Sequence, residues 1–436
     1  MGEQMRTLEL HSGEIKEKFL DPLTSNRKLE IRQNTSDEDR ERPDGEFQRD
    51  YTRVLYSSSF RRLQGKMQLY AVESDQFIRN RLTHSLEVAQ IARSIATAIG
   101  YSQQEMYVVE TCSLAHDIGN PPFGHAGEAF LNELSKSFGG FEGNAQTFRI
   151  LTTVEQKRHS FQGLNLTRRT LLGILKYYNP FQVTKQGDSQ YVLKYPKFLY
   201  DDDYALVGDI VRETGVCLRT LDVQIVDIAD EIAYAAHDLE DGLRLGVFTA
   251  DEILHEFSTK IEDEESVKQL DRIIVESKDK AGFRKKGVDS AEFSKLYRKE
   301  ITSQIINTLI HDIGIVTLSE KEKTVRGTAR DAEIGFVHYK ALAAGLKKTI
   351  FDCVTNNDAV YAYEAKGKRM LEDLFDFFRG NVQYLPSEYR VANIVRQYAP
   401  KYDIINEKDL QDRLIIDYIS GMMDEYVKTV HRKFIG

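Results

Sequence analysis

The stretch "CSLAHDIGNPPFGHAGEAF", residues 112–130, joins a His-Asp dipeptide to two prolines and a second histidine. The apolar residues before His116 predict a helix that ends before the prolines, because proline cannot continue a helix. The glycines on either side of the prolines permit tight turns, and a new helix is expected to begin near His125. This path would return His125 and Glu128, three residues apart on one helical face, to the end of the first helix.

Composition and periodicity predict a mainly α fold. The chain has 436 residues, of which 41% are hydrophobic and 29% charged, which is typical of a folded protein with a large core. Apolar residues recur at helical spacing in residues 82–99 and again in residues 221–239. Residues 190–200 follow the turn-like "KQGDS" and are the one predicted strand or short hairpin.

Charge and cysteine content narrow the class of protein. The net charge of −9 disfavours nonspecific binding of nucleic acid by the whole surface. Cys112, Cys217 and Cys353 are far apart and odd in number, so they predict neither a disulfide framework nor a cysteine zinc site. No apolar run approaches the ~20 residues that span a bilayer, and the N-terminus lacks a signal-peptide pattern. These features predict a soluble cytoplasmic protein.

Three predicted helices supply metal-ligating side chains. His84 lies near the start of an amphipathic helix, and a second helix ends at His116-Asp117. In a third, Asp230, Tyr234 and Asp238 follow one another at intervals of four residues along an otherwise apolar face. Buried charge is costly unless it is paired or bound to a metal, so two imidazoles with two carboxylates favour a metal site.

Some alternatives stay open on these patterns. Asp227 lies one turn before Asp230, and periodicity does not separate the two as ligands. Any single histidine is more often an ordinary core or surface residue; the combination is what favours a metal. A second "HDIG" begins at His311, but no run of buried carboxylates is near it, so His311 and Asp312 are predicted to be surface or packing residues.

Further polar residues around these helices suggest chemistry on a phosphate. A histidine beside a carboxylate, as at His125 and Glu128, suits a general base or acid, although the pair could simply cap and pack the loop. A basic cluster precedes His84 and could bind a polyphosphate or be a solvated face. Its basic members are Arg53, Arg61, Arg62, Lys66 and Arg81, and the amide side chain of Gln68 lies among them in the sequence. Arg81 is the strongest candidate because it lies one turn from His84.

Five motifs now form a recognisable set: "SSFRRLQGKMQ", "RNRLTHSLEVAQIAR", "AHDIGNPPFGHAGE", "FEGNAQTFRIL" and "ADEIAYAAHDLED". His84, His116-Asp117 and Asp230 resemble the H…HD…D signature of the HD-domain metal-dependent phosphohydrolases. The five motifs together resemble the deoxyguanosinetriphosphate triphosphohydrolase (dGTPase) branch, over about Phe47 to Asp241. Alignment to this branch selects Asp230 over Asp227.

The resemblance implies a helical HD fold with a helical C-terminal extension and at most a short β-hairpin. The domains would be an N-terminal arm (1–46), an HD catalytic core (47–245) and a helical C-terminal region packed on the core (246–436). The implied reaction cleaves a dNTP between the deoxyribose O5′ and the α-phosphorus, releasing a deoxynucleoside and inorganic triphosphate.

The resemblance also assigns roles to residues. One divalent ion, Mg²⁺ or Mn²⁺, would be bound by His84, His116, Asp117 and Asp230. The attacking water would be handled by His125 with Glu128. The nucleotide would be contacted by Gln68 and Arg81, and the sugar and phosphates by Tyr234 and Asp238.

The implied partners are a dNTP substrate, a dNTP effector, further copies of the chain in a homo-oligomer such as a hexamer, and single-stranded DNA. Two alternatives remain: another HD phosphohydrolase, such as a nucleotidase or phosphodiesterase, and a nucleotide- or DNA-binding regulator with a vestigial site. Base preference stays open. Tyr361 and Tyr363 are candidates for the side chain that excludes a ribose 2′-hydroxyl.

Overall fold

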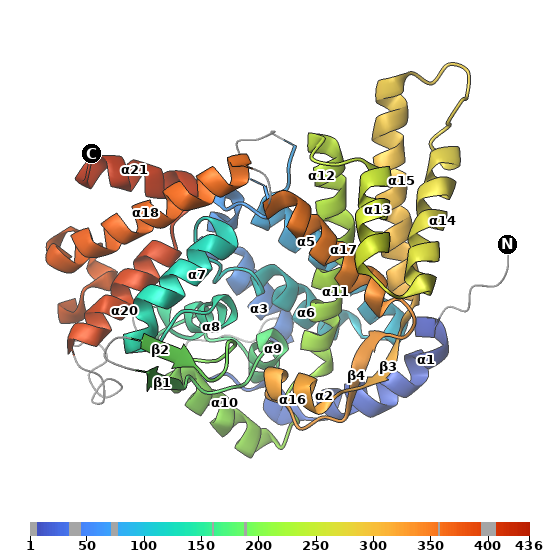
Figure 1. The fold of residues 1–436 in the computed structure, drawn as a ribbon. Helices are drawn as coiled ribbons and strands as arrows, with labels where there is room; N and C mark the ends of the chain where they lie inside the picture. The colour runs from blue at the N-terminus through green and yellow to red at the C-terminus, as the bar shows by residue number, and fades with distance from the viewer. Residues whose placement is uncertain are drawn as a thin grey trace.

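The computed structural model describes residues 7–34, 45–70, 77–158, 161–186, 190–355, 358–393 and 407–436. These residues are mostly helical, with strands in two small antiparallel pairs (Figure 1). The predicted mainly α fold is therefore confirmed. Within the described ranges, no helix has both the length and the apolar character needed to cross a membrane.

Helix α11 (Leu221–Ala233) forms the buried centre of the fold, and nearly all of its residues are buried. It packs against α5 (Arg81–Ile99), α6 (Gln103–Ala115) and α9 (Arg168–Ile174). A charged residue within this core needs a partner. Asp222 has one in Arg169, whose Nε and Nη2 each donate to a carboxylate oxygen at 3.1 Å.

The sequence sets where the two histidine-bearing helices begin. Helix α5 starts with a capping box between Asn80 and Thr83, and α6 starts with another between Ser102 and Glu105. These caps satisfy backbone N–H groups that the first helical turn leaves without partners. They place His84 in the first turn of α5, and His116 directly after α6.

Short helices account for the rest of the N-terminal half. They are α1 (Thr7–Ile15), α2 (Asp21–Thr24), α3 (Gly45–Leu55), α4 (Ser58–Arg62), α7 (Gly124–Ser135), α8 (Gly143–Arg149) and α10 (Asp201–Thr214). Within the predicted N-terminal arm, residues 7–30 form helices whose apolar side chains, including Leu8, Ile15 and Leu20, are buried in the main core.

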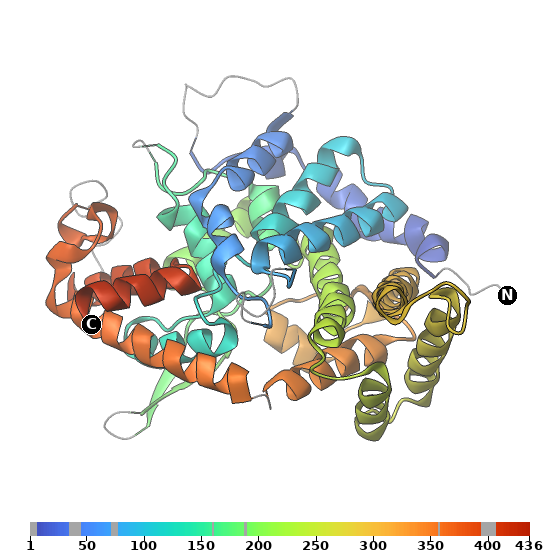
Figure 2. The same cartoon turned by 90° about the horizontal axis from the view of Figure 1, so that it is seen from above.

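The C-terminal half begins with α12 and divides between two hydrophobic cores. Its helices are α12 (Leu239–Leu245), α13 (Ala250–Lys260), α14 (Glu264–Lys280), α15 (Ser290–His311), α16 (Glu320–Arg326), α17 (Lys340–Thr355), α18 (Asp358–Gly380), α20 (Glu407–Ser420) and α21 (Asp424–Phe434). The main core includes apolar residues up to Val354. A second core joins α7 to α18, α20 and α21 through residues such as Leu131, Phe375 and Ile419. These last helices gather on the side of the molecule opposite α1 (Figures 1 and 2).

One of the two strand pairs was predicted and the other was not. Strand β1 (Val183–Gln186) pairs with β2 (Gln190–Leu193), within or next to the stretch predicted as a hairpin. Strand β3 (Ile313–Thr317) pairs with β4 (Ala332–Phe336). β3 begins inside the second "HDIG", at Ile313, and α16 separates it from its partner. β3 packs against α1, and β4 packs against α11. The stability of this strand pair therefore depends on distant helices, and the local sequence gives little indication that the pair forms.

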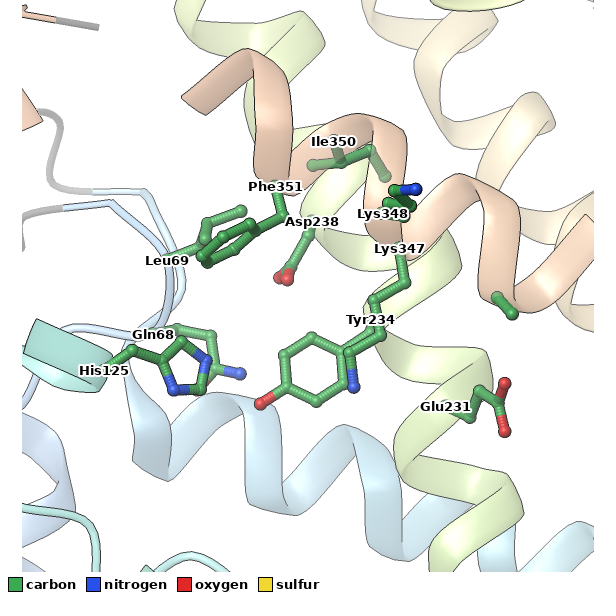
Figure 3. Close-up of a pocket in the computed structure, with 11 residues that line it drawn as sticks. Gln68, Leu69, His125, Glu231, Tyr234, Asp238, Lys347, Lys348, Ile350 and Phe351 are labelled. Carbon is green, nitrogen blue, oxygen red and sulfur yellow. The ribbon is translucent and has the colours of Figure 1, made fainter. Parts of the chain in front are cut away.

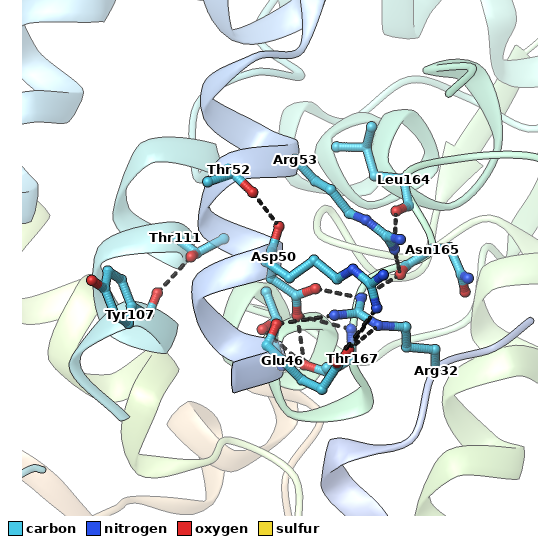
Figure 4. Close-up of polar contacts among 12 residues, drawn as sticks. Arg32, Glu46, Asp50, Thr52, Arg53, Tyr107, Thr111, Leu164, Asn165 and Thr167 are labelled. Carbon is cyan, nitrogen blue, oxygen red and sulfur yellow. Dashed lines mark hydrogen bonds and ion pairs between the residues drawn. The ribbon is translucent and has the colours of Figure 1, made fainter. Parts of the chain in front are cut away.

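A buried ion-pair network ties the N-terminal segment to the core (Figure 4). The Asp50 carboxylate, which is fully buried, accepts hydrogen bonds from Arg32 Nη1 at 2.5 Å and from the Thr167 backbone N–H at 2.9 Å. Arg32 also donates to the Asn165 carbonyl at 2.6 Å and to Glu46 Oε2 at 2.7 Å. The network therefore joins residues more than 130 positions apart, and Asp50 is its least exposed anion.

Asp50→Ala is expected to lower the free energy of unfolding by about 3–5 kcal/mol, because it leaves the buried Arg32 guanidinium without its closest carboxylate. Glu46→Gln removes a more exposed partner of the same guanidinium, so a clearly smaller loss is expected. Urea denaturation of both variants measures the difference. Equal losses would contradict the assigned importance of Asp50.

Candidate metal centre

Four side chains from α5, α11 and the end of α6 meet at one point. Potential ligand atoms of His84, His116 and Asp117 all lie within 4.8 Å of one another. His84 Nε2 lies 3.1 Å and His116 Nε2 lies 3.5 Å from the same Asp230 oxygen. The structure therefore brings together the four residues that the sequence predicts as ligands; His84 is completely buried, and Asp117 and Asp230 are each 8% exposed.

The donor atoms fit a cation. His116 Nδ1 lies 2.6 Å from the Ser113 carbonyl oxygen, which can only accept, so Nδ1 carries the proton and Nε2 faces the carboxylates. His116 Nε2 is buried and has no hydrogen-bond partner. Burial opposes a charge on this ring, yet Asp117 and Asp230 raise its pKa to about 9. The surroundings thus favour positive charge, and two imidazoles with two carboxylates form a ligand set for a divalent ion.

The geometry distinguishes Asp230 from Asp227. The Asp227 carboxylate is held by two cations: Lys176 lies 2.9 Å from one oxygen, and Arg219 donates to the other. Asp230 instead points at both imidazoles, with Lys176 farther away at 3.7 Å. Periodicity could not separate the two because they lie three residues apart, one turn from each other on the same side of α11.

The Asp117 carboxylate is held in place by two neighbours. Arg81 Nη1 donates to one oxygen at 2.6 Å, and Asn120 Nδ2 donates to the other at 2.6 Å. Arg81 is buried, and its Nε has no hydrogen-bond partner. The strongest cation candidate from the sequence therefore lies beside a candidate metal ligand.

His125 and Glu128 lie at the entrance to this centre, in the first turns of α7. His125 Nδ1 is 3.7 Å from Glu128, and its side chain is 61% exposed. Burial would raise the pKa of Glu128, but His125, Lys197 and the Gly143 N–H outweigh it and lower the pKa to about 2. Glu128 is therefore an anion at any physiological pH, and the exposed His125 side chain lies beside it at the cavity entrance, with its ring edge-on to Phe351 at 5.9 Å between centroids.

Two adjoining cavities meet at His125, Tyr234 and Lys347. The first, of about 200 Å³, contains His116, Asp117 and Asp230 and is also lined by four cations: Arg81, Lys176, Lys197 and Lys347. The second, of about 450 Å³, is less polar and is lined by Gln68, Leu69, Asp238, Ile350 and Phe351, among others. Figure 3 shows Gln68, His125, Tyr234, Asp238 and Phe351 around one open space.

A π-helical turn, Tyr234–Asp238, follows α11 and shapes the second cavity. Tyr234 and Asp238 both line this cavity, and the spacing of four residues predicted that they share a face. The centroids of the Tyr234 and His84 rings are 5.2 Å apart, and Lys347 Nζ is 4.2 Å from the centroid of the Tyr234 ring.

The basic cluster predicted upstream of His84 does not line these cavities, apart from Gln68 and Arg81. Arg53 donates to the carbonyl oxygens of Leu164 and Asn165, Arg62 donates to Ser59, and the buried Lys66 donates to two backbone carbonyls. Besides Arg81, the cations that line the smaller cavity are Lys176, Lys197 and Lys347, which come from distant segments that carry no motif.

Two further sequence interpretations are decided by the structure. Asp312 is buried and accepts hydrogen bonds from the backbone N–H groups of His338 and Tyr339, just before α17, so the second "HDIG" has a packing role. Neither tyrosine proposed to exclude a 2′-hydroxyl lines either of these two cavities. Tyr361 is 71% exposed, and the Tyr363 hydroxyl donates to Asp424. The aromatic side chains in the larger cavity are Tyr234 and Phe351.

A divalent ion is expected to raise the melting temperature of the protein, because it would bind the folded state alone. At a Mn²⁺ concentration of 100 times Kd, this corresponds to about 2.7 kcal/mol. His116→Ala should abolish the increase, whereas His311→Ala, in the second "HDIG", should keep it. Thermal unfolding with and without Mn²⁺ measures the effect, and a loss in both variants would contradict the assignment.

Comparison with known proteins agrees with this arrangement. Residues 81–235 match the HD domain, and residues 338–433 match a phosphohydrolase-associated domain. Deoxyguanosinetriphosphate triphosphohydrolase-like protein 2 of Vibrio cholerae is 43% identical over 411 residues, covering 94% of this chain and 93% of the relative. Similarly named proteins of Caulobacter sp. and Ralstonia pickettii are each 33% identical, covering 91% and 90% of this chain, and 91% and 88% of those relatives. The chain belongs to the deoxyguanosinetriphosphate triphosphohydrolase-like family of HD-domain proteins.

Proposed function

We propose that this protein is a metal-dependent hydrolase that converts dNTPs, dGTP among them, into a deoxynucleoside and inorganic triphosphate. The pairing of the two cavities carries this proposal: a cation-lined cavity with a metal-ligand set opens into a larger, less polar one. A dNTP has the same two halves, a polyanion joined to a largely apolar nucleoside. The names of the relatives point to the same substrate class.

The triphosphate would occupy the smaller cavity. Arg81, Lys176, Lys197 and Lys347 surround it, and lysine and arginine are the side chains that best neutralise phosphate oxygens. Lys176 and Lys197 already bind carboxylates, at 2.9 Å from Asp227 and 2.6 Å from Glu142. These pairs hold the two ammonium groups at the cavity wall before a nucleotide arrives.

The deoxynucleoside would occupy the larger cavity. Both polar atoms of the Gln68 amide and one Asp238 oxygen are buried without a hydrogen-bond partner. Such groups are costly unless a ligand satisfies them. Burial, assisted by Asp241, raises the pKa of Asp238 well above its ordinary value, so its carboxyl can donate as well as accept. Gln68 and Asp238 therefore suit the hydroxyl groups and base edge of a nucleoside, with Tyr234 alongside the sugar.

His84, His116, Asp117 and Asp230 would hold one divalent ion, and Mg²⁺ or Mn²⁺ suits their mixture of nitrogen and oxygen atoms. When bound, the ion supplies Lewis acidity at the phosphate. The protein's own side chains then handle the protons. His125 Nδ1 faces the Glu128 anion, which leaves Nε2 to take a proton from the attacking water. The bond between the α-phosphorus and the deoxyribose O5′ breaks as the water oxygen bonds to phosphorus, and O5′ takes up a proton, which balances the proton that the water gives to His125.

Product analysis tests the proposed reaction. The purified protein is incubated with Mn²⁺ or Mg²⁺ and with each dNTP alone and all four mixed. We expect deoxynucleoside by chromatography and intact triphosphate by phosphorus NMR, both lost in His116→Ala. Monophosphates or diphosphates with free phosphate would assign the protein to another HD phosphohydrolase reaction, and tight nucleotide binding without turnover would favour a regulator with an inactive site.

His125→Ala and Glu128→Gln are expected to lower kcat by ~100- to 10,000-fold, the usual effect of losing a general base or the group that orients it. Because neither residue is among the four candidate ligands, the increase in melting temperature with Mn²⁺ should persist. His255→Ala, an exposed histidine on α13 outside both cavities, is the control and should retain full activity. Activity within a factor of two in His125→Ala would refute its role.

A further inference from the structure

Three segments that are distant in the sequence meet at the Asp424 carboxylate, beside the candidate active site. Asp424 is buried and is the first residue of α21. Its Oδ2 accepts the backbone N–H of Met67 at 3.0 Å, and its Oδ1 accepts that of Phe123 at 3.1 Å. The Tyr363 hydroxyl on α18 also donates to Oδ2, at 3.2 Å. Both carboxylate oxygens are therefore engaged.

Each of the two backbone contacts lies next to a residue with a proposed role. Met67 directly precedes Gln68, whose amide lines the larger cavity. Phe123 lies two residues before His125, which lines both cavities. One side chain from the C-terminal region thus holds the segment that would contact the nucleoside and the segment that would handle the water.

The loop before His125 needs such support. Phe123 has a φ of 62°, a left-handed conformation that a non-glycine residue adopts only at a cost in free energy. Its ring packs against α18, where a Cβ atom at Gly367 would lie 2.3 Å from Phe123 Cγ. The Phe123 ring also meets Tyr363 edge-on, with 5.4 Å between centroids. The strained turn is therefore clamped by α18 and by Asp424.

Lys66 also connects the segments of Met67 and Phe123 with the end of α20. Its buried Nζ donates to the carbonyl oxygens of Asn120 at 2.5 Å and Ser420 at 2.8 Å. Asn120 in turn donates to Asp117. The turn between α20 and α21 is thus bonded directly to the residues around the metal-ligand set.

We propose that Asp424 is a positioning residue for the proposed hydrolysis: it fixes Gln68 and His125 relative to each other, although it touches neither. This inference rests on the proposed function of the site. Misplacement of a reacting group by about 1 Å can cost ~100-fold in rate, so one shared anchor for two segments has a measurable kinetic effect.

The test compares Asp424→Asn with Asp417→Asn. Asparagine keeps the shape of the side chain but removes its charge and one acceptor oxygen, so one of the two N–H groups loses its acceptor and the other keeps only a neutral one. Asp417 is the matched control: it is an equally buried carboxylate of α20 that binds Arg149 and Gln146, outside both segments. Hydrogen exchange by mass spectrometry reports the backbone contacts independently of activity, and steady-state kinetics reports kcat and KM.

For Asp424→Asn we expect faster exchange, by about tenfold, in the peptides that contain Met67 and Phe123, because the N–H groups lose a charged acceptor. We also expect kcat/KM to fall by ~100-fold, through both a lower kcat and a higher KM. The Mn²⁺-dependent increase in melting temperature should remain. Asp417→Asn should lower the melting temperature, leave exchange in both peptides unchanged, and keep kcat within a factor of two.

Exchange that accelerates in only one peptide or in neither, or an equal loss of kcat in Asp417→Asn, would overturn the proposal. If Asp424→Asn does not fold, Tyr363→Phe removes a single donor to the same carboxylate and should accelerate exchange in the same two peptides to a smaller extent. If the wild-type protein hydrolyses no dNTP, the proposed function fails, while the exchange measurement still decides whether Asp424 joins the two segments.

Discussion

Two carboxylates and two imidazoles meet at one buried point in this protein, and the surrounding side chains compensate the free-energy cost of burying the two negative charges. Asp117 and Asp230 are both buried within 3.5 Å of the His116 ring. Carboxylates so placed are stable only when cations or hydrogen-bond donors compensate them. Arg81 and Asn120 do this for Asp117, and the imidazoles with Lys176 do it for Asp230. A divalent ion would complete the compensation, which is why we regard this point as the functional centre.

The C-terminal half is part of the site and not an appendage to it. Helix α17 contributes Lys347 to both cavities and Phe351 to the larger one. The start of α17 is held by Asp312, so the second "HDIG" contributes to the site indirectly, by orienting the helix that carries those two residues. Further along the chain, the Asp424 carboxylate accepts hydrogen bonds from the backbone N–H groups of Met67 and Phe123, which lie close to Gln68 and His125 in the sequence. The two segments that match known domains, residues 81–235 and 338–433, therefore build one site together.

Prediction from the sequence succeeded where a residue's role is tied to local spacing. Apolar periodicity predicted that His84 and Asp230 lie on inward-facing helices and that His116 lies at the end of one, as in the structure. The spacing of Tyr234 and Asp238 also predicted a shared face, and both line the larger cavity, although the π-helical turn there was not predicted. Prediction failed where the role depends on distant contacts. Lys176, Lys197 and Lys347 resemble any other surface lysine in the sequence, and only packing brings their ammonium groups to the cavity wall.

The sequence by itself determined the helical class and the candidate metal ligands His84, His116 and Asp117, because periodicity and the pairing of His with Asp act over a few neighbouring positions. Tertiary structure decided which cations face the cavity, that the Asp230 carboxylate and not that of Asp227 points at the imidazoles, and that Asp424 anchors two segments about 300 or more residues away. The physical reason is that a side chain's electrostatic partners depend on distance in space. Chain separation says little about that distance until the core has packed.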